Sequence, residues 1–336
     1  MKAEKRKERI DKGIKVRTDG IYALASVKDL TYLVMPRLIL ILGLLSAPLV
    51  MPDLYWQRVI CMACVFALLS LSFDFLAHFT GLVSLGGALF IGLGGYITGY
   101  LNVHMGMHPF LTIPIATTTG AIIGALLLLP CLSLKDIYFA IVTLMYPLLL
   151  ARIIPAMNIL GGTDGIVGID TFPNIWVSSY LVIAVTLLAL FFLRRLTNED
   201  YGMVLRSIKD NDLAVQASGI NITRYKIQAV LMASALGSFS GAYLVHLYGW
   251  AGISLFALDF SILPIAATVA GGAGTLVGAV LGSLILTPVS ESLRDFGTLR
   301  IVFYSLVLLG FILFNPDGMM NYLERKYHQF ERWKEV

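Results

Sequence analysis

The chain has 336 residues, of which 57% are hydrophobic and 14% charged, and its formal net charge at pH 7 is +4. Together with a mean hydropathy of +0.80, this composition excludes an ordinary soluble domain and indicates an integral membrane protein. The apolar runs are continuous, and their lengths are close to that of a membrane-spanning helix, which needs about 20 residues. A barrel strand needs only about 10 residues, of alternating character. We therefore expect an all-α fold, a polytopic membrane helix bundle.

A basic segment at residues 1–31 precedes the first apolar run. The apolar runs predict about ten transmembrane helices within a single membrane domain at residues 32–318, followed by a tail at residues 319–336. A polar, charged region at residues 196–226 separates the sixth run from the seventh. We place the spans at residues 32–51, 59–78, 82–101, 109–131, 134–157, 175–193, 227–247, 254–271, 273–290 and 299–315.

The distribution of basic residues predicts the orientation, because Lys and Arg near span ends are retained in the cytoplasm. They crowd the N-terminal segment, the central polar region and the tail, which ten spans place on the same side. The stretch 153–175 has no Lys or Arg and is expected outside, although Arg58, Arg294 and Arg300 also fall on that side. The expected location is the plasma membrane, with both termini cytoplasmic.

The three cysteines, Cys61, Cys64 and Cys131, all fall inside predicted spans, where we expect them to pack as small hydrophobic residues. No phosphate-binding Gly-x-x-x-x-Gly-Lys-[Ser/Thr] motif occurs, and the glycine cluster at residues 271–278 is not followed by a lysine. We expect this chain to bind no cofactor and no metal. If ATP drives the protein, another subunit must bind it.

Glycines recur at a spacing of four residues in several predicted spans, as in Gly120–x–x–x–Gly124 and Gly237–x–x–x–Gly241. This spacing predicts close helix packing, since small residues let two backbones approach in a membrane. The glycine-rich stretches 80–95 and 160–168 are less regular. Because irregular backbone at membrane depth must be buried in protein or line a wet cavity, either stretch could border the path of a solute.

Asp74 is the ionisable residue placed deepest within a predicted span, and it lies one helical turn before His78. A buried charge in lipid is costly, so such a pair indicates either a cavity or a bonding partner. Two interpretations stay open. The pair could carry protons, or both side chains could hydrogen-bond to neighbouring helices.

The polar region predicts two short helices. Residues 201–209 can form one, with Val204, Leu205 and Ile208 on its apolar side. Asp210 or Asn211 can then cap a second helix that ends at a C-terminal glycine. The second helix is too short to bury its small apolar face alone, so it must press on the bundle, the lipid interface or a partner protein.

Residues 201–226 also carry a resemblance. They resemble the coupling segment of the permeases of branched-chain amino-acid ABC importers, in which a short helix ending in Ala-x-Gly inserts into the ATPase subunit. Further motifs agree in order and extend the likeness over residues 60–320. They are the stretches 81–86, 138–144, 161–165, 261–278 and 315–318.

The resemblance implies that the chain is not an enzyme but a permease subunit. It would work with a sister permease, in a heterodimer, with two ATP-binding cassette ATPase subunits that bind ATP and Mg, and with an extracytoplasmic solute-binding protein. The implied cargo is a branched-chain amino acid or a similar small solute. One alternative is a urea or short-amide permease of the same family. A rival of a different class is an ATP-independent secondary transporter that uses Asp74 and His78.

The resemblance also implies which residues act. The residues expected to couple to the ATPase lie in the short helices of the polar region: Arg206, Lys209, Asp210, Asn211, Asp212, Leu213, Ala214, Ala217 and Gly219. The residues expected along the translocation path come from the motifs that carry the resemblance and from the second span: Asp74, Ser84, Gly86, Thr143, Gly161, Gly162, Asp164 and Ser261.

The chain departs from the family pattern near the second span. Asp74 stands where the family usually has Asn, and His78 where it usually has Gly. Leu82 and Gly87 replace a customary Gln and His. These departures bear on which solute is carried.

Overall fold

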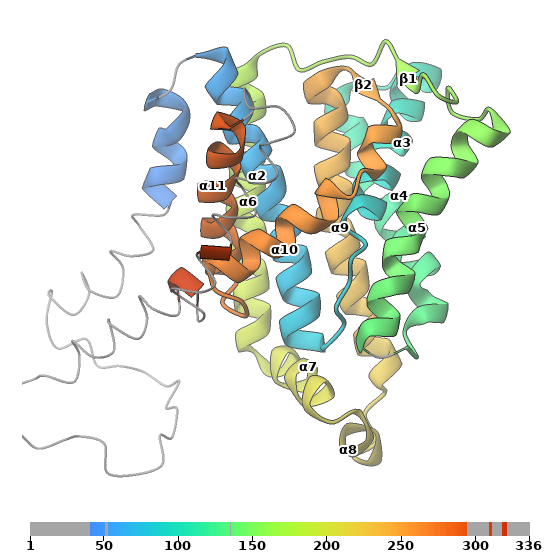
Figure 1. The fold of residues 1–336 in the computed structure, drawn as a ribbon, viewed down its shortest axis with the longest axis vertical. Helices are drawn as coiled ribbons and strands as arrows, with labels where there is room; N and C mark the ends of the chain where they lie inside the picture. Colours follow the sequence, from blue (N-terminus) through green and yellow to red (C-terminus); the bar gives the residue numbers. More distant parts are fainter. Residues whose placement is uncertain (1–40, 51–52, 135, 294–308, 311–317, 321–336) are drawn as a thin grey trace, which may run out of the picture.

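The fold is a bundle of helices that run between two ends, with two short helices, α7 and α8, at one end (Figure 1). The computed structural model describes residues 41–50, 53–134, 136–293, 309–310 and 318–320. The predicted span 299–315 and the terminal segments 1–31 and 319–336 therefore lie wholly or largely outside the described residues, and the predicted span 32–51 is described only at residues 41–50.

The helices follow one another with short connections. In chain order, the elements are α2 (Leu54–Asp74), the π-helical turn η1 (Phe75–Thr80), α3 (Gly87–Met105), α4 (Pro109–Leu128), η2 (Leu129–Cys131), α5 (Asp136–Met157), β1 (Ile166–Val167), α6 (Ile175–Asn198), α7 (Asp200–Asp210), α8 (Asp212–Ala217), α9 (Ile222–Tyr248), β2 (Trp250–Ala251), η3 (Ile253–Phe256), α10 (Asp259–Gly271) and α11 (Val277–Ser292). The two strands pair antiparallel. An apolar helix at Ile41–Val50 precedes α2 in the chain.

Five helices in the described residues are long and apolar enough to cross a membrane: Leu54–Thr80, Pro109–Cys131, Ile137–Met157, Ile175–Asn198 and Ile222–Tyr248. The all-α membrane bundle expected from the composition is thus confirmed, whereas the count of ten is not reached within the described part of the chain. The run predicted as one span at residues 254–271 is divided into η3 and the 13-residue helix α10. Such a helix is shorter than the about 20 residues a straight crossing needs.

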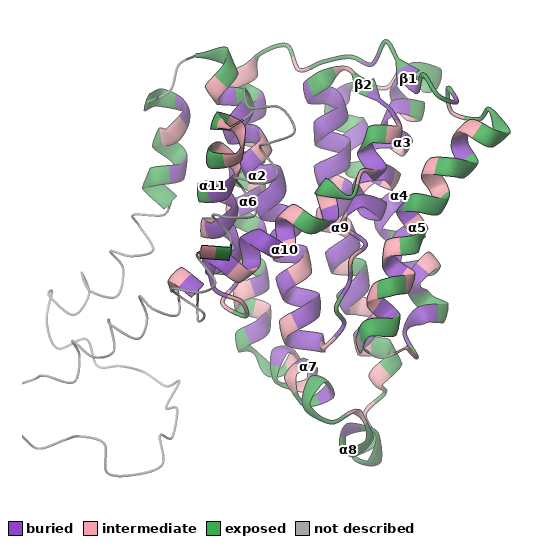
Figure 2. Ribbon diagram, viewed as in Figure 1, coloured by how far each residue is buried: buried purple, intermediate pink, exposed green. Residues whose placement is uncertain are grey.

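The interior of the bundle is built around α2 and α9 (Figure 2). The most apolar windows of their spans are 94% and 78% buried, compared with 22% for α5. Glycines allow the helices next to α9 to approach it closely, because a Cβ at Gly241 would collide with the carbonyl oxygen of Ile91, and one at Gly94 with that of Ser238. The packing role predicted for the spaced glycines is confirmed at Gly241.

The cysteines are buried and free, so their predicted role as small packing residues is confirmed. Cys61 Sγ lies 3.3 Å from Ser179 Oγ. Hydroxyl groups supply further bonds between helices, as where Ser72 Oγ donates to the carbonyl oxygen of Ala233 at 2.9 Å. In a bilayer, such bonds hold helices together where the hydrophobic effect contributes little.

At the end opposite α7 and α8, a polar network joins the exposed Asp170 to three buried side chains and holds the connection between α5 and α6. The amide Nδ2 of Asn102 donates to Asp170 Oδ2 at 3.1 Å, and Asn102 Oδ1 accepts the backbone N–H of Asp170 at 2.8 Å. The ring of His246 lies between the backbone oxygen of Asp170, 2.7 Å from Nδ1, and Thr112 Oγ1, 2.6 Å from Nε2. Both ring nitrogens of this buried His246 therefore have a partner.

Candidate functional site

Helix α7 lies against the end of α2, with the face predicted from the sequence turned inward. Leu205 and Ile208 are 0% and 1% exposed, and Val204 is half-buried. Tyr201 packs on Tyr225 of α9, with ring centroids 5.4 Å apart. Burial raises the pKa of Tyr201 to about 12, so this phenol is neutral at physiological pH.

Two cations of α7 reach into the bundle. Lys209 Nζ donates to the carbonyl oxygen of His78 at 3.1 Å, and the guanidinium of Arg206 stands 5.2 Å from the centre of the Phe79 ring. Gly81, which ends η1 in a left-handed conformation with φ of 75°, has the Lys209 side chain packed against it. Arg206 and Lys209 were expected to contact an ATPase, and here their charged ends contact η1.

Helix α8 projects beyond α7, away from the bundle (Figure 1). Of the two caps predicted, Asn211 is the one used, since its Oδ1 accepts the backbone N–H of Ala214 at 3.2 Å. Lys226 Nζ, on α9, donates to Asp212 Oδ2 at 3.1 Å and fixes the start of the helix. Val215 packs inward.

The side of α8 opposite Val215 is exposed. Apart from Leu213, its apolar side chains are small. Leu213 is 71% exposed, and Ala214 and Ala217 are exposed beside it. The helix ends at Gly219, with φ of 82° and open space where a Cβ would lie. The predicted helix, its glycine end and its apolar face are thus confirmed.

Four of the residues predicted for the translocation path meet at the extended segment 81–86, between η1 and α3. Thr143 Oγ1, on α5, accepts the backbone N–H of Leu85 at 2.9 Å. Ser261 Oγ, on α10, accepts the backbone N–H of Ala88 at 3.1 Å. Ser84 Oγ accepts the backbone N–H of Gly86 at 3.2 Å. The irregular backbone is thereby hydrogen-bonded by α5 at Leu85, and the first turn of α3 that follows it is hydrogen-bonded by α10 at Ala88, as membrane depth requires.

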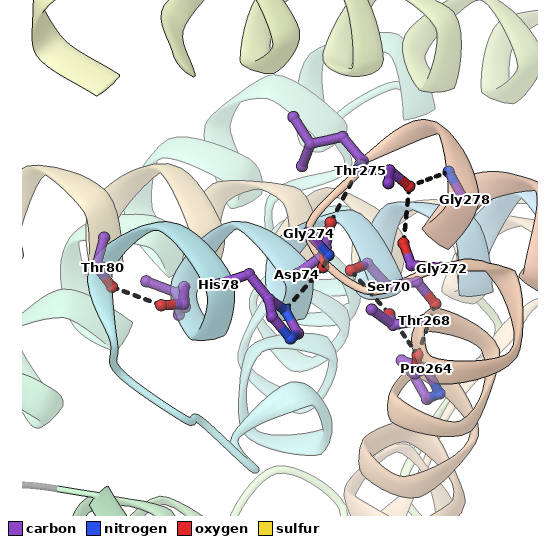
Figure 3. Close-up of polar contacts among 12 residues, drawn as sticks. Ser70, Asp74, His78, Thr80, Pro264, Thr268, Gly272, Gly274, Thr275 and Gly278 are labelled. Atoms are coloured by element: carbon purple, nitrogen blue, oxygen red, sulfur yellow. Dashed lines mark hydrogen bonds and ion pairs between the residues drawn. The ribbon is translucent and has the colours of Figure 1, made fainter. Parts of the chain in front are cut away.

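Asp74 occupies a different place, where α2 passes into η1 (Figure 3). The residue is fully buried. Its Oδ1 accepts the backbone N–H of Gly274 at 2.7 Å, and its Oδ2 accepts that of Leu276 at 2.9 Å. His78 Nδ1 lies 2.8 Å from Asp74 Oδ1. The carboxylate thus holds the loop between α10 and α11, which favours the second interpretation of the pair, hydrogen bonding to a neighbouring element, over proton transfer.

The loop that Asp74 holds has an unusual backbone, because Gly274 and Leu276 have φ of 79° and 56°. A leucine in this region is strained and needs support from its surroundings. Nearby, Ser70 Oγ on α2 donates to the carbonyl oxygen of Pro264 at 3.1 Å (Figure 3). The same Ser70 Oγ lies 2.8 Å from Ser283 Oγ on α11. Helix α2 is therefore bonded to α10, to α11 and to the loop between them.

The remaining path candidates, Gly161, Gly162 and Asp164, lie in the connection after α5, at the end opposite α8. The carbonyl oxygen of Asp164 accepts the indole N–H of Trp250 at 2.9 Å. The eight candidates thus fall into three groups, at this connection, at the segment 81–86 and at Asp74.

The structure contains a cavity that the sequence motifs did not indicate. It has a volume of about 690 Å³ and lies between α2, the end of α9, η3, α10 and α11. Among the described residues, the charged side chains of its lining are Arg58, Asp259 and Glu291. The signal in the sequence was their charge near span ends, which by itself does not bring three separate elements together. Within the described residues, no three His, Cys, Asp or Glu side chains gather as metal ligands.

The comparisons with known proteins concern the same part of the chain. A sequence profile of the family described as "Branched-chain amino acid transport system / permease component" matches residues 55–315. The chain is 27% identical over 296 residues to the high-affinity branched-chain amino acid transport system permease protein LivM of Salmonella typhimurium, which covers 77% of this chain and 68% of that protein.

Two further relatives are similar. The LivM protein of Escherichia coli K12, with the same description, is 27% identical over 293 residues, or 76% of this chain and 68% of its own length. The probable branched-chain amino acid transport permease protein LivH of Methanocaldococcus jannaschii is 26% identical over 258 residues, or 68% of this chain and 79% of its own. No solved structure matches the chain.

Proposed function

The chain belongs to the family of branched-chain amino acid transport permease components, and we propose that it forms, together with a sister permease, the membrane path of an ATP-binding cassette importer. Its cargo is a branched-chain amino acid or a similar small apolar solute, delivered by an extracytoplasmic binding protein. The family match and the long apolar helices make it a multi-pass membrane protein rather than an enzyme.

The observation that carries the proposal is the exposed face of α8 at one end of a lipid-embedded bundle. Leu213 is 71% exposed there. A helix of six residues cannot stabilise itself in water, and an exposed apolar face of this kind is typical of a protein contact. In the proposal, this face binds one of two ATPase subunits, and these subunits bind ATP and Mg. Their nucleotide cycle biases two arrangements of the permease pair.

The relatives support a sister permease. Both a LivM and a LivH protein are similar to this chain, so the proposal places two related subunits side by side, in a heterodimer. The finer topology is also part of the proposal: ten spans in the bacterial inner membrane, with α7, α8 and both termini in the cytoplasm. It follows from the basic residues near the span ends.

Uptake by the reconstituted complex tests the cargo. The chain is co-expressed with the sister permease, ATPase and binding protein of its own system, and the complex is placed in proteoliposomes that contain ATP. We expect ATP-dependent uptake of labelled leucine and no uptake of labelled urea or acetamide. Uptake of urea or acetamide in place of leucine would transfer the chain to the amide-transporting branch. Uptake driven by a pH gradient without ATP would contradict the importer proposal altogether.

A further inference from the structure

The cavity between α2, α10 and α11 lies at the end of the bundle opposite α7 and α8, because Tyr55 and Arg58 at the start of α2 and Trp250 beyond the end of α9 all line it. Its volume of about 690 Å³ falls within the range of about 300–1,000 Å³ that is typical of small-molecule sites. In the proposed orientation, this is the side from which a binding protein delivers solute.

The cavity lining combines opposite charges. Arg58 and Asp259 both border it, and among the described residues neither side chain makes an ion pair or a hydrogen bond. The third charged group, Glu291, accepts a hydrogen bond from the Tyr55 hydroxyl at 3.1 Å. Ionisable groups in a membrane domain commonly face a wet cavity that serves a solute. Within the described part of the chain, one cation and one anion of this lining are therefore open to a ligand.

Most of the remaining wall is apolar, and Ser254, Thr287 and Ser290 add hydroxyl groups to it. Val59, Met62 and Phe66 of α2 face Leu263 of α10 and Leu286 of α11 across the cavity. Phe66 stacks on Phe260, with ring centroids 5.7 Å apart, which fixes part of the wall. A neutral amide such as urea has no charged groups to pair with the lining charges and no aliphatic side chain to pack against the wall. A zwitterion with a branched aliphatic side chain matches all three features.

We propose that this cavity is a binding site for an aliphatic α-amino acid. The Arg58 guanidinium contacts its carboxylate, the Asp259 carboxylate contacts its ammonium group, and the apolar wall takes its side chain. The inference rests on the proposed function, which it deepens by giving the solute a place in the membrane domain.

The site is connected to the coupling end of the bundle. The cavity is walled by α10 and α11, and the loop between these helices is held by Asp74. Asp74 in turn lies one helical turn from His78, whose carbonyl oxygen accepts the Lys209 Nζ of α7. A displacement of α7 would thus reach the wall of the site through a short series of bonds.

Photolabelling tests the inference. The assembled complex in nanodiscs is irradiated with photo-leucine, which retains both charged groups of leucine and carries a diazirine in the side chain, and the adducts are mapped by mass spectrometry. We expect adducts on α2 between Val59 and Phe66 and on α10 or α11, suppressed by excess leucine but not by urea. In Asp259→Asn and in Arg58→Gln, labelling should fall about tenfold, the loss of one charged hydrogen bond.

The control variants are matched. Asp200→Asn also removes an acidic residue from the first turn of a helix, but on α7, and Arg152→Gln removes an exposed arginine of α5. Both should label like the unmodified protein. The conservative changes Asp259→Glu and Arg58→Lys should restore most of the labelling, which separates loss of charge from loss of folding.

Two readouts distinguish failure of the site from failure of the function. If leucine is taken up but the adducts lie elsewhere, or are unchanged in Asp259→Asn and Arg58→Gln, the site is wrong and the proposed function stands. If the complex takes up no leucine, the proposed function fails, and with it the identity of the ligand.

Discussion

At the scale of single residues, Asp74 is the most informative position. A carboxylate with no solvent exposure is costly unless hydrogen bonds offset the loss of water. Here two backbone N–H groups, from Gly274 and Leu276, and the ring of His78 surround it. An asparagine has one acceptor oxygen, so it could satisfy only one of the two amides.

We expect Asp74→Asn and His78→Ala to be non-additive, because both change the same cluster. Asp74→Asn alone should destabilise the protein by about 1–3 kcal/mol, since it leaves a buried N–H without an acceptor. The change in unfolding free energy of the double variant should differ from the sum of the two single changes by about 0.5–3 kcal/mol. Reversible unfolding in mixed micelles, followed by circular dichroism, measures all four proteins. Strictly additive effects would mean that the short distance between the two side chains carries no energy.

At the scale of elements, the sequence predicted the helices of the polar region at residues 196–226 well, since the signals for them are local. The cap at Asn211, the terminal Gly219 and the inward Leu205 and Ile208 all depend on residues within one or two turns. Of these elements, α8 projects from the bundle beyond α7 (Figure 1).

The sequence did not predict the elements that depend on distant partners. Asp74 and Gly274 are 200 residues apart, so no local pattern joins them. The apolar run at residues 254–271 looks continuous, but its backbone is interrupted by η3 before α10 begins. Hydropathy records apolar character and not the conformation of the backbone, so it cannot distinguish one crossing from a broken helix.

Helix α7 should transmit movement through η1. Lys209→Met removes the hydrogen bond to His78 while keeping the apolar part of the side chain on Gly81. We expect the complex to assemble, and the leucine transported per ATP hydrolysed to fall severalfold, because the two ends of the bundle become less tightly linked. Parallel assays of uptake and ATPase activity measure this ratio.

Arg224→Met serves as the control, since it removes an exposed cation from the first turn of α9. This variant should keep the normal ratio of transport to hydrolysis. An unchanged ratio in Lys209→Met would show that α7 does not act through this contact.

At the scale of the whole molecule, three regions lie in series along the bundle. They are the exposed α8, the Asp74 cluster that joins α2 to the loop between α10 and α11, and the cavity near Arg58. The family match spans all three, because it covers residues 55–315. In the proposed function, an event at one end of the bundle would change the shape of the cavity at the other, as an importer driven by a separate ATPase requires.

The most direct measurement is co-purification of the ATPase subunit with the permease pair, for Gly219→Trp and for Gly106→Trp. Both glycines end a helix with positive φ, 82° and 63°, and both have open space beside them, so the two changes impose similar strain at opposite ends of the bundle. We expect the Gly219→Trp complex to lose the ATPase and the Gly106→Trp complex to retain it. The permease pair should remain monodisperse in both variants. Full retention of the ATPase by Gly219→Trp, or equal loss in both variants, would contradict docking at α8.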